Sequence, residues 1–400
     1  MNILILCKVV DNYGDMGFAY RLALSLADLA PQIQISLVMS NLPAFAPLTE
    51  PPVDANLPDQ RCGAFRLLDW NDGDVCRRAC EEAFPDVVLE CFQCGRPEWL
   101  EDLLFGGRLK ELGRTVRVVN IEYLTAEDWA DDFHLLKSGT RFPCVKKVNF
   151  MPGFTDKTGG LLLDKAFMAG LKHRTAFPSA LASWLSKEDC ADLGSEGCFS
   201  VLVFSYSRDF SSIIMALKEY SMVRKVHVFA AAGAGRDSFI EAFRRAGEPF
   251  ALTLLPFLPQ KLWDSLLLQF DFAFVRGEDS FSRMCLSGTP FVWQAYPQDG
   301  QFHLVKVRAF LERLHRHLPE DAFTLLAAAF MQYNREPSLP LSSDAADALA
   351  ALPLSGLSGV ELWLRLFSCA AGLREGFAAF SRELIGNGDL AAHILAALSA

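Results

Sequence analysis

The chain has 400 residues and a formal net charge of −10, with 38 basic and 48 acidic side chains. This balance argues against a nucleic-acid-binding protein, which usually presents a basic surface. With 51% hydrophobic and 22% charged residues, the composition is globular, and the length predicts two or three domains. No apolar run reaches the roughly 18 residues of a membrane span, and the first residues lack a signal peptide's basic start. We therefore expect a soluble, cytoplasmic protein that contacts no membrane and no nucleic acid.

The first half of the chain alternates predicted strands and helices. A strand over residues 3–7 leads into a helix over 17–30. Further segments are short, continuous and rich in Val, Ile and Leu, which is typical of strands that are buried on both faces. They cover residues 33–40, 86–90 and 116–121.

The alternation restarts in the second half. Strands are predicted over 199–205, 226–231, 251–255, 270–275 and 290–294, and helices over 211–220, 236–246 and 260–269. Two such series predict an α/β protein with two doubly wound, Rossmann-like domains. We expect the first domain over 1–170, a polar connection over 171–197 and the second domain over 198–364. A helical segment over about 365–400 is expected to pack back on the first domain.

The junction after the fourth strand of the second series carries the strongest functional signal. Arg276 and Gly277 end the apolar run, and Glu278, Asp279 and Ser280 form a helix start with acids in its first turn and a Ser or Asp cap. Open α/β sheets bind ligands at such junctions, where free N–H groups favour phosphate and an arginine adds a bidentate clamp. The carboxylates suit sugar hydroxyls. The pattern indicates a nucleotide-sugar site; a surface turn with a local ion pair is the alternative.

Aromatic and amide side chains follow neighbouring strands of the same domain. Rings at such positions can stack on a nucleotide base, and amides can bind the edge of a pyrimidine. The alternative is ordinary core or hinge packing. These residues are Phe204, Tyr206, Phe257, Gln260, Tyr296 and Gln298.

The loop between the first strand and the first helix carries two aspartates, Asp11 and Asp15, four residues apart. Its glycines allow a close approach of backbone to ligand, but it lacks the glycine pattern of dinucleotide-binding loops. Because carboxylates repel phosphate, the pair suits acid–base chemistry better. Asp15 could instead simply cap the helix.

Eleven cysteines are scattered along the chain. Cys91 and Cys94 form a CxxC motif, but no second motif completes a zinc site. Reduced thiols are the simpler interpretation, with metal or redox use as the alternative.

Taken together, the motifs closely resemble one family, the bacterial protein-arginine rhamnosyltransferases that modify elongation factor P (the EarP family). The resemblance runs in order over residues 1 to about 310. It is carried by CKVVDNYGDMG at the start, NIEYLTAEDW at 120–129, MPGFTDKTGGL at 151–161 and FVRGEDSF…PFVWQAYPQ at 274–298.

The resemblance implies a GT-B glycosyltransferase, in which two Rossmann-like domains face each other across a cleft. It implies transfer of L-rhamnose from dTDP-β-L-rhamnose to an arginine of elongation factor P, with inversion and with no metal or other cofactor. Other GT-B activities on a nucleotide sugar, transfer to a small molecule or epimerisation, are the alternative. A non-catalytic binding protein is a third possibility, which the two aspartates disfavour.

The resemblance also implies roles for individual residues. Asp15 and Asp11 match the catalytic aspartates, with Asp15 as general base, and Glu278 is expected to assist catalysis. The residues expected to contact the donor are Tyr13, Gly14, Phe204, Tyr206, Phe257, Gln260, Arg276, Glu278, Asp279, Ser280, Tyr296 and Gln298.

Overall fold

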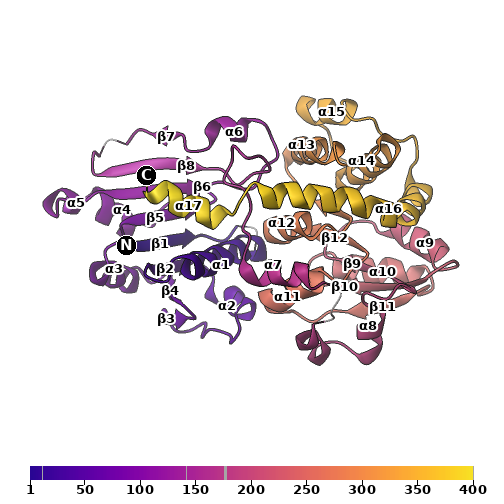
Figure 1. Ribbon diagram of the computed structural model, residues 1–400, viewed down its shortest axis with the longest axis horizontal. Helices are drawn as coiled ribbons and strands as arrows, with labels where there is room; N and C mark the ends of the chain where they lie inside the picture. Colours follow the sequence, from indigo (N-terminus) through magenta and orange to yellow (C-terminus); the bar gives the residue numbers. More distant parts are fainter. Residues whose placement is uncertain (11, 141, 175–177, 400) are drawn as a thin grey trace. The chain divides into compact units, whose positions relative to one another are not determined.

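The computed structural model describes residues 1–400 except 11, 141, 175–177 and 400. The described chain divides into two compact units (Figure 1). Unit 1 contains Met1–Lys165 and Ile385–Ala400, and unit 2 contains Ala166–Leu384. Each unit is built on a mostly parallel sheet flanked by helices, as the sequence predicts.

Within the described residues, the sheet of unit 1 has eight strands in the order β3-β4-β2-β1-β5-β6-β8-β7. Neighbouring strands are parallel except at the edges, where β3 and β7 run antiparallel to β4 and β8. The strands are β1 (Asn2–Cys7), β2 (Gln34–Met39), β3 (Asp59–Cys62), β4 (Phe65–Asp69), β5 (Val87–Cys91), β6 (Val116–Ile121), β7 (Lys137–Ser138) and β8 (Val145–Phe150). The four central strands β1, β2, β5 and β6 are those that the apolar runs predict.

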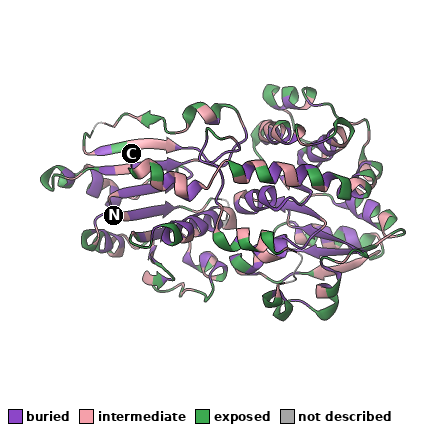
Figure 2. Cartoon of the chain, viewed as in Figure 1, coloured by how far each residue is buried: buried purple, intermediate pink, exposed green. Residues whose placement is uncertain are grey.

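The helices of unit 1 cover this sheet on both faces. They are α1 (Asn12–Leu29), α2 (Leu42–Phe45), η1 (Ala46–Leu48), α3 (Gly73–Glu82), α4 (Glu98–Phe105), α5 (Arg108–Glu111), α6 (Trp129–Phe133) and α17 (Leu390–Ser399). One core lies between the sheet and α3 and α4, where Leu4, Leu6 and Val88 pack against Cys80 and Leu100. Figure 2 shows the central strands of both sheets buried, whereas most helices expose one face.

The first helix begins five residues earlier than predicted, at Asn12 instead of residue 17. Residues 12–16, which the sequence predicts as part of a loop, therefore belong to α1. Asp15 stabilises this start, because its carboxylate accepts a hydrogen bond from the backbone N–H of Val10, ahead of the helix.

The sheet of unit 2 is wholly parallel, in the order β11-β10-β9-β12-β13. Its strands are β9 (Cys198–Val203), β10 (Lys225–Ala230), β11 (Ala251–Leu254), β12 (Phe272–Arg276) and β13 (Phe291–Gln294). All five lie where the sequence predicts them, to within about two residues at each end.

The helices of unit 2 lie on both faces of its sheet. They are α7 (Lys165–Lys172), η2 (Ser179–Ser183), α8 (Lys187–Asp192), α9 (Ser211–Tyr220), α10 (Arg236–Arg245), α11 (Gln260–Leu267), α12 (Glu278–Ser287), η3 (Asp299–Gln301), α13 (His303–His315), α14 (Glu320–Asn334), α15 (Ser343–Ala350) and α16 (Gly359–Gly386). Aromatic side chains fill the core; the Phe274 ring, for example, lies 5.0 Å from that of Tyr333 and 5.5 Å from that of Trp363.

The C-terminal segment differs from the prediction that it packs on the first domain as one piece. Most of α16 belongs to unit 2, because Phe367 contacts Phe272 and Phe377 contacts Phe291 in that unit's sheet. The part after Leu384 belongs to unit 1, where Leu390 donates its N–H to the carbonyl of Leu161.

The predicted connection over 171–197 also belongs to unit 2 in its described part. The guanidinium of Arg174 donates to the carbonyl of Ser287 and to the hydroxyl of Thr289. At the end of α8, Asp192 accepts hydrogen bonds from Lys225 and His227 of β10. These hydrogen bonds hold the segment against unit 2, although its polar composition predicts a linker.

Among the residues that the structure describes, no helix is both long enough and apolar enough to cross a membrane.

Candidate active site

Unit 2 has its topological switch point between β9 and β12. The chain proceeds from β9 to β10 and β11 on one side and then returns to place β12 and β13 on the other. Ligands of open α/β sheets bind outside the carboxyl ends of the strands at such a point. Phe204 and Tyr206 follow the end of β9, and Arg276 is the last residue of β12. These predicted site residues therefore lie together at the position where open α/β sheets bind ligands.

Arg276 is buried, with 8% of its surface exposed, and lies between two aromatic rings. Its guanidinium carbon is 4.9 Å from the centre of the Phe204 ring and 4.5 Å from that of Tyr206. Such cation–π contacts hold a guanidinium in a fixed plane. The geometry fits a diphosphate clamp beside a surface for a flat base.

The start of α12 differs from the predicted Ser or Asp cap. The N-cap is Gly277, at φ +74° and ψ 156°, with no side-chain capping hydrogen bond. Only glycine adopts this conformation readily, so the backbone can turn sharply between β12 and α12. Asp279 instead accepts a hydrogen bond from Gln260 at 3.1 Å, and Ser280 accepts one from the indole of Trp263, also at 3.1 Å. α11 therefore braces the first turn of α12.

A buried polar network holds the backbone at Tyr206 in place. The amide oxygen of Gln294 accepts hydrogen bonds from the hydroxyl of Ser205 (2.5 Å) and from the N–H of Tyr206 (2.9 Å). The hydroxyl of Tyr333 donates to that of Ser205 at 2.7 Å. Gly235 donates its N–H to the Ser205 carbonyl, and a Cβ there would lie 2.6 Å from that oxygen. The turn after β9 is thus packed from both sides.

The remaining predicted donor contacts of unit 2 are more exposed. Tyr296 is 57% exposed, and its ring meets that of Tyr206 edge-on at 5.8 Å. Phe257 is half-buried after β11 and Glu278 is half-buried in the first turn of α12. The exposed Gln298 donates its N–H to the imidazole of His303.

Unit 1 has its own switch point, between β1 and β5. Asp15 lies here in the first turn of α1 and is fully buried. Val10 donates its N–H to Oδ2 of Asp15 at 2.8 Å, and the hydroxyl of Tyr123 donates to Oδ1 at 3.3 Å. Tyr13 and Gly14, on the same turn, are half-buried. The predicted second aspartate, Asp11, lies outside the described residues.

The loop after β5 is strained. Phe92 and Gln93 have φ values of +60° and +49°, in the left-handed region that bulky side chains rarely adopt. Each such residue costs on the order of 1–3 kcal/mol, and strain of this size concentrates at functional sites. The Phe92 ring stacks on Tyr123 at 4.2 Å between centres and also contacts Phe18.

The CxxC cysteines lie beside this site as free thiols, with Cys91 buried and Cys94 half-buried. Burial, with a contribution from Asp15, raises the pKa values of Cys7 and Cys91 well above the ordinary range. Burial raises that of Cys94 to about 11. No disulfide joins the cysteines, all of which lie among the described residues, and no described group of His, Cys, Asp and Glu is arranged to hold a metal ion.

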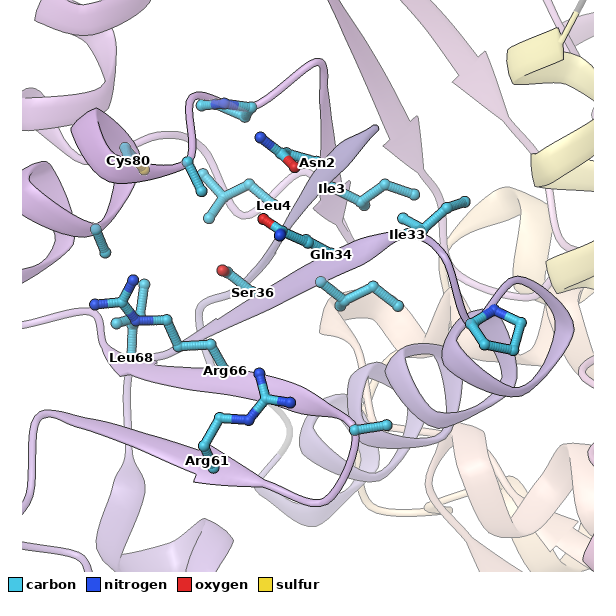
Figure 3. A pocket seen from close by; sticks show the side chains of 16 residues that line it. Asn2, Ile3, Leu4, Ile33, Gln34, Ser36, Arg61, Arg66, Leu68 and Cys80 are labelled. Carbon is cyan, nitrogen blue, oxygen red and sulfur yellow. The ribbon is translucent and has the colours of Figure 1, made fainter.

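A pocket of about 360 Å³ lies at the amino ends of strands β1, β2 and β4, opposite the carboxyl ends that form the switch point (Figure 3). Asn2, Gln34, Ser36, Arg61 and Arg66 line it. None of the predicted site residues does, and parallel sheets bind ligands at the other edge.

Several residues of these sites escape the sequence analysis. In unit 1 these are Phe92 and Tyr123, which stack on each other. In unit 2 they are Trp263, which contacts Ser280, and Gln294 and Tyr333, which both contact Ser205. The signals that could have found Phe92 and Tyr123 are their motifs, the CxxC sequence and NIEYLTAEDW, which both follow predicted strands.

Two doubly wound α/β units in one chain, each with polar side chains at its switch point, are the architecture of the GT-B class of glycosyltransferases and related nucleotide-sugar enzymes. A solved structure of the UDP-GlcNAc 2-epimerase from Neisseria meningitidis bound to UDP-GlcNAc has this fold, with a TM-score of 0.53, 10% identity, and coverage of 100% of this chain and 99% of that one. A solved EarP structure, described as the basis for EarP-mediated arginine glycosylation of translation elongation factor EF-P, has a TM-score of 0.55, 20% identity, and coverage of 98% and 97%.

Residues 3–398 match the family model of the elongation-factor P (EF-P) rhamnosyltransferase EarP. A protein-arginine rhamnosyltransferase of Shewanella oneidensis is 30% identical over 90% of this chain and 95% of its own length. One of Neisseria meningitidis is 30% identical over 96% and 93%, and one of Pseudomonas putida is 31% identical over 83% and 86%. The chain therefore belongs to the EarP family and is an enzyme, a glycosyltransferase.

Proposed function

We propose that this enzyme transfers L-rhamnose from dTDP-β-L-rhamnose to an arginine side chain of elongation factor P, with inversion at the anomeric carbon and without a metal ion. The observation that carries the proposal is the family match over residues 3–398, which includes both switch points. The names of the relatives support rhamnose and arginine, and the solved EarP structure supports the acceptor protein. Because the acceptor is a translation factor, we also propose that the enzyme works in the cytoplasm.

On the donor side, the chemistry must bind a diphosphate and stabilise its charge as it leaves. Arg276 supplies a guanidinium held in a fixed plane, and the start of α12 supplies backbone N–H groups and the positive end of a helix dipole. Preorganised donors of this kind can replace a metal ion at developing negative charge. Phe204 and Tyr206 provide the surface on which thymine would stack, and Glu278 is placed at the helix start for a sugar hydroxyl.

On the acceptor side, the nucleophile is a guanidinium, which is always charged and therefore a poor nucleophile. One nitrogen must lose a proton as it attacks. Asp15 is the carboxylate for this role: it is buried, fixed by hydrogen bonds and located at the switch point of unit 1. Asp11, the second aspartate of the same motif, would pair with the remaining N–H groups of the guanidinium.

The step balances without a further reactant. A bond forms between the arginine nitrogen and the anomeric carbon while the bond from that carbon to the diphosphate oxygen breaks. The nitrogen proton passes to Asp15, and dTDP leaves with the electron pair. A single displacement of this kind inverts the anomeric centre.

The test is intact-mass spectrometry of elongation factor P after incubation with the enzyme and dTDP-β-L-rhamnose in the presence of EDTA. We expect the mass of one deoxyhexose to appear on a single arginine. An acceptor with that arginine changed to lysine is the matched control and should stay unmodified. Transfer that stops with EDTA would contradict the metal-free mechanism, and donor turnover without any acceptor protein would favour epimerisation.

A further inference from the structure

We propose that Tyr123 is a positioning residue for Asp15 and that Phe92 holds Tyr123 in place. The inference rests on the proposed function and adds residues outside the aspartate loop to its acid–base machinery. It also gives a role to two motifs that the proposed function leaves unused, the CxxC sequence that contains Phe92 and the NIEYLTAEDW sequence that contains Tyr123.

The carboxylate of Asp15 is oriented by donors on both of its oxygens. The N–H of Val10 holds Oδ2, and the hydroxyl of Tyr123 holds Oδ1 from the end of β6. A side-chain carboxylate turns easily about its last bond, so a donor on one oxygen alone leaves its plane loosely defined. The tyrosine hydroxyl restricts that rotation, and a general base works only when its lone pair points at the proton that it receives.

The Tyr123 ring is itself held by a built clamp. It stacks on Phe92 at an interplanar angle of 11°, and the Phe92 ring also contacts Phe18 of α1. The N–H of Phe92 donates to the Ile121 carbonyl at 2.6 Å, which ties the end of β5 to the end of β6. Phe92 takes up this position with a left-handed backbone, which has an energetic cost for a bulky residue. Such a cost indicates that the placement of the ring is functional.

The Gln93 side chain completes the clamp by donating to the carboxylate of Glu122, the residue before Tyr123. Asn120 donates to the same carboxylate at 2.6 Å. Both left-handed residues of the loop after β5 therefore contact the segment that carries Tyr123: Phe92 through the Ile121 carbonyl and the Tyr123 ring, and Gln93 through the Glu122 side chain.

The hydrogen bond also affects the protonation of the base. A donor to the charged carboxylate favours the ionised form, so loss of the hydroxyl makes Asp15 easier to protonate. Besides Tyr123, the thiols of Cys7 and Cys91 face this carboxylate, and Tyr13 lies on the same helical turn. Burial keeps both thiols neutral across the pH range of interest, so they add no charge change of their own.

The test compares Tyr123→Phe with wild type in steady-state transfer of rhamnose to elongation factor P. We expect kcat to fall about tenfold, KM for the donor to stay unchanged, and the acidic limb of the kcat–pH profile to move to higher pH. Phe92→Leu should move the same quantities in the same direction by a smaller amount. Tyr20→Phe, which removes a tyrosine hydroxyl from α1 outside the site, is the matched control and should match wild type.

A wild-type kcat and pH profile in Tyr123→Phe would overturn this inference, and so would a loss that appears only in KM for the donor. If Tyr123→Phe unfolds, Phe92→Leu decides alone by the shift of its acidic limb. Failure of the proposed function gives a different result, because the wild-type enzyme itself would then transfer no rhamnose to the acceptor.

Discussion

The two units place their functional residues at the same topological position but equip it with opposite charge. At the switch point of unit 2, the buried cation Arg276 lies between two aromatic rings at the start of a helix. At that of unit 1, the buried anion Asp15 lies in the first turn of a helix and accepts hydrogen bonds from a backbone N–H and a tyrosine hydroxyl. The proposed function uses the first position to bind an anion and the second as a general base.

The topology of each sheet therefore determines where a ligand binds, whereas the side chains at that point determine the chemistry. The two sites share a second feature, a tyrosine hydroxyl that donates a hydrogen bond to a site residue or its neighbour. Tyr123 donates to Asp15, and Tyr333 donates to Ser205, the residue before Tyr206. The two sites can therefore be separated by mutation into turnover effects and donor-affinity effects.

Asp15→Asn should give the largest effect, confined to turnover. An amide of the same shape cannot accept the proton, so the rate of transfer should fall about 10²–10⁴-fold while dTDP affinity stays the same. The measurement is single-turnover mass spectrometry combined with calorimetric titration of dTDP. Asp28→Asn, an exposed position on the same helix, is the control. Near wild-type turnover in Asp15→Asn would remove Asp15 as the base.

Arg276→Ala should show the opposite pattern, with weaker donor binding as its primary defect. Loss of a charge-assisted contact to phosphate costs about 1.5–3 kcal/mol, so calorimetry should show dTDP affinity lower by about 10–100-fold. Arg276→Lys should recover part of the loss, because lysine keeps the charge but not the planar pair of donors. Arg245→Ala, at an exposed site on α10, is the control. An unchanged affinity in Arg276→Ala would contradict the diphosphate assignment.

How far the sequence predicts these sites depends on how local the signal is. The strands of unit 2 and the four central strands of unit 1 are apolar runs, and a buried parallel strand needs little else. The apolar pattern does not predict the four outer strands β3, β4, β7 and β8. Charged residues interrupt it there, as in FRLLD of β4 and VKKVNF of β8, because these strands lie near the edges of the sheet.

The site follows the same rule. Arg276 and Asp15 sit on strand–helix junctions that the sequence marks by itself. The stack of Phe92 on Tyr123 joins residues about 30 positions apart. The network from Tyr333 through Ser205 to Gln294 joins residues 128 and 89 positions apart. Such pairs depend on strand order, which hydrophobic periodicity does not encode. The sequence predicts a polar cap at this junction because acids follow Gly277, whereas the structure has Gly277 itself as the N-cap, at a φ of +74° that favours glycine.

Gly277→Ala tests the strand–helix junction on which the unit 2 site depends. The backbone at φ +74° and ψ 156° is strained for any residue with a Cβ, so the free energy of unfolding should fall by about 1–3 kcal/mol. Urea denaturation measures this change. Gly356→Ala, where a Cβ would meet open space, is the control and should stay within about 0.5 kcal/mol of wild type. Equal stability of the two variants would contradict the strained-cap assignment.

Tyr333→Phe should give the smallest effect. It removes the hydroxyl that corresponds in unit 2 to the Tyr123 hydroxyl of unit 1. Without its donor, Ser205 is held less firmly, and the turn that presents Tyr206 loosens beneath the proposed base-stacking surface. We expect dTDP affinity to fall about three- to tenfold, in line with the loss of one neutral hydrogen bond, with kcat and its pH profile unchanged.

The cation–π contact between Arg208 and the ring at position 333 should survive in phenylalanine, so the variant isolates the hydroxyl. Tyr220→Phe, whose ring packs on Phe199 in the same unit, is the matched control. If Tyr333→Phe instead moved the acidic limb of the pH profile, the division of labour between the two sites would be wrong, since only residues that reach Asp15 should affect protonation of the base.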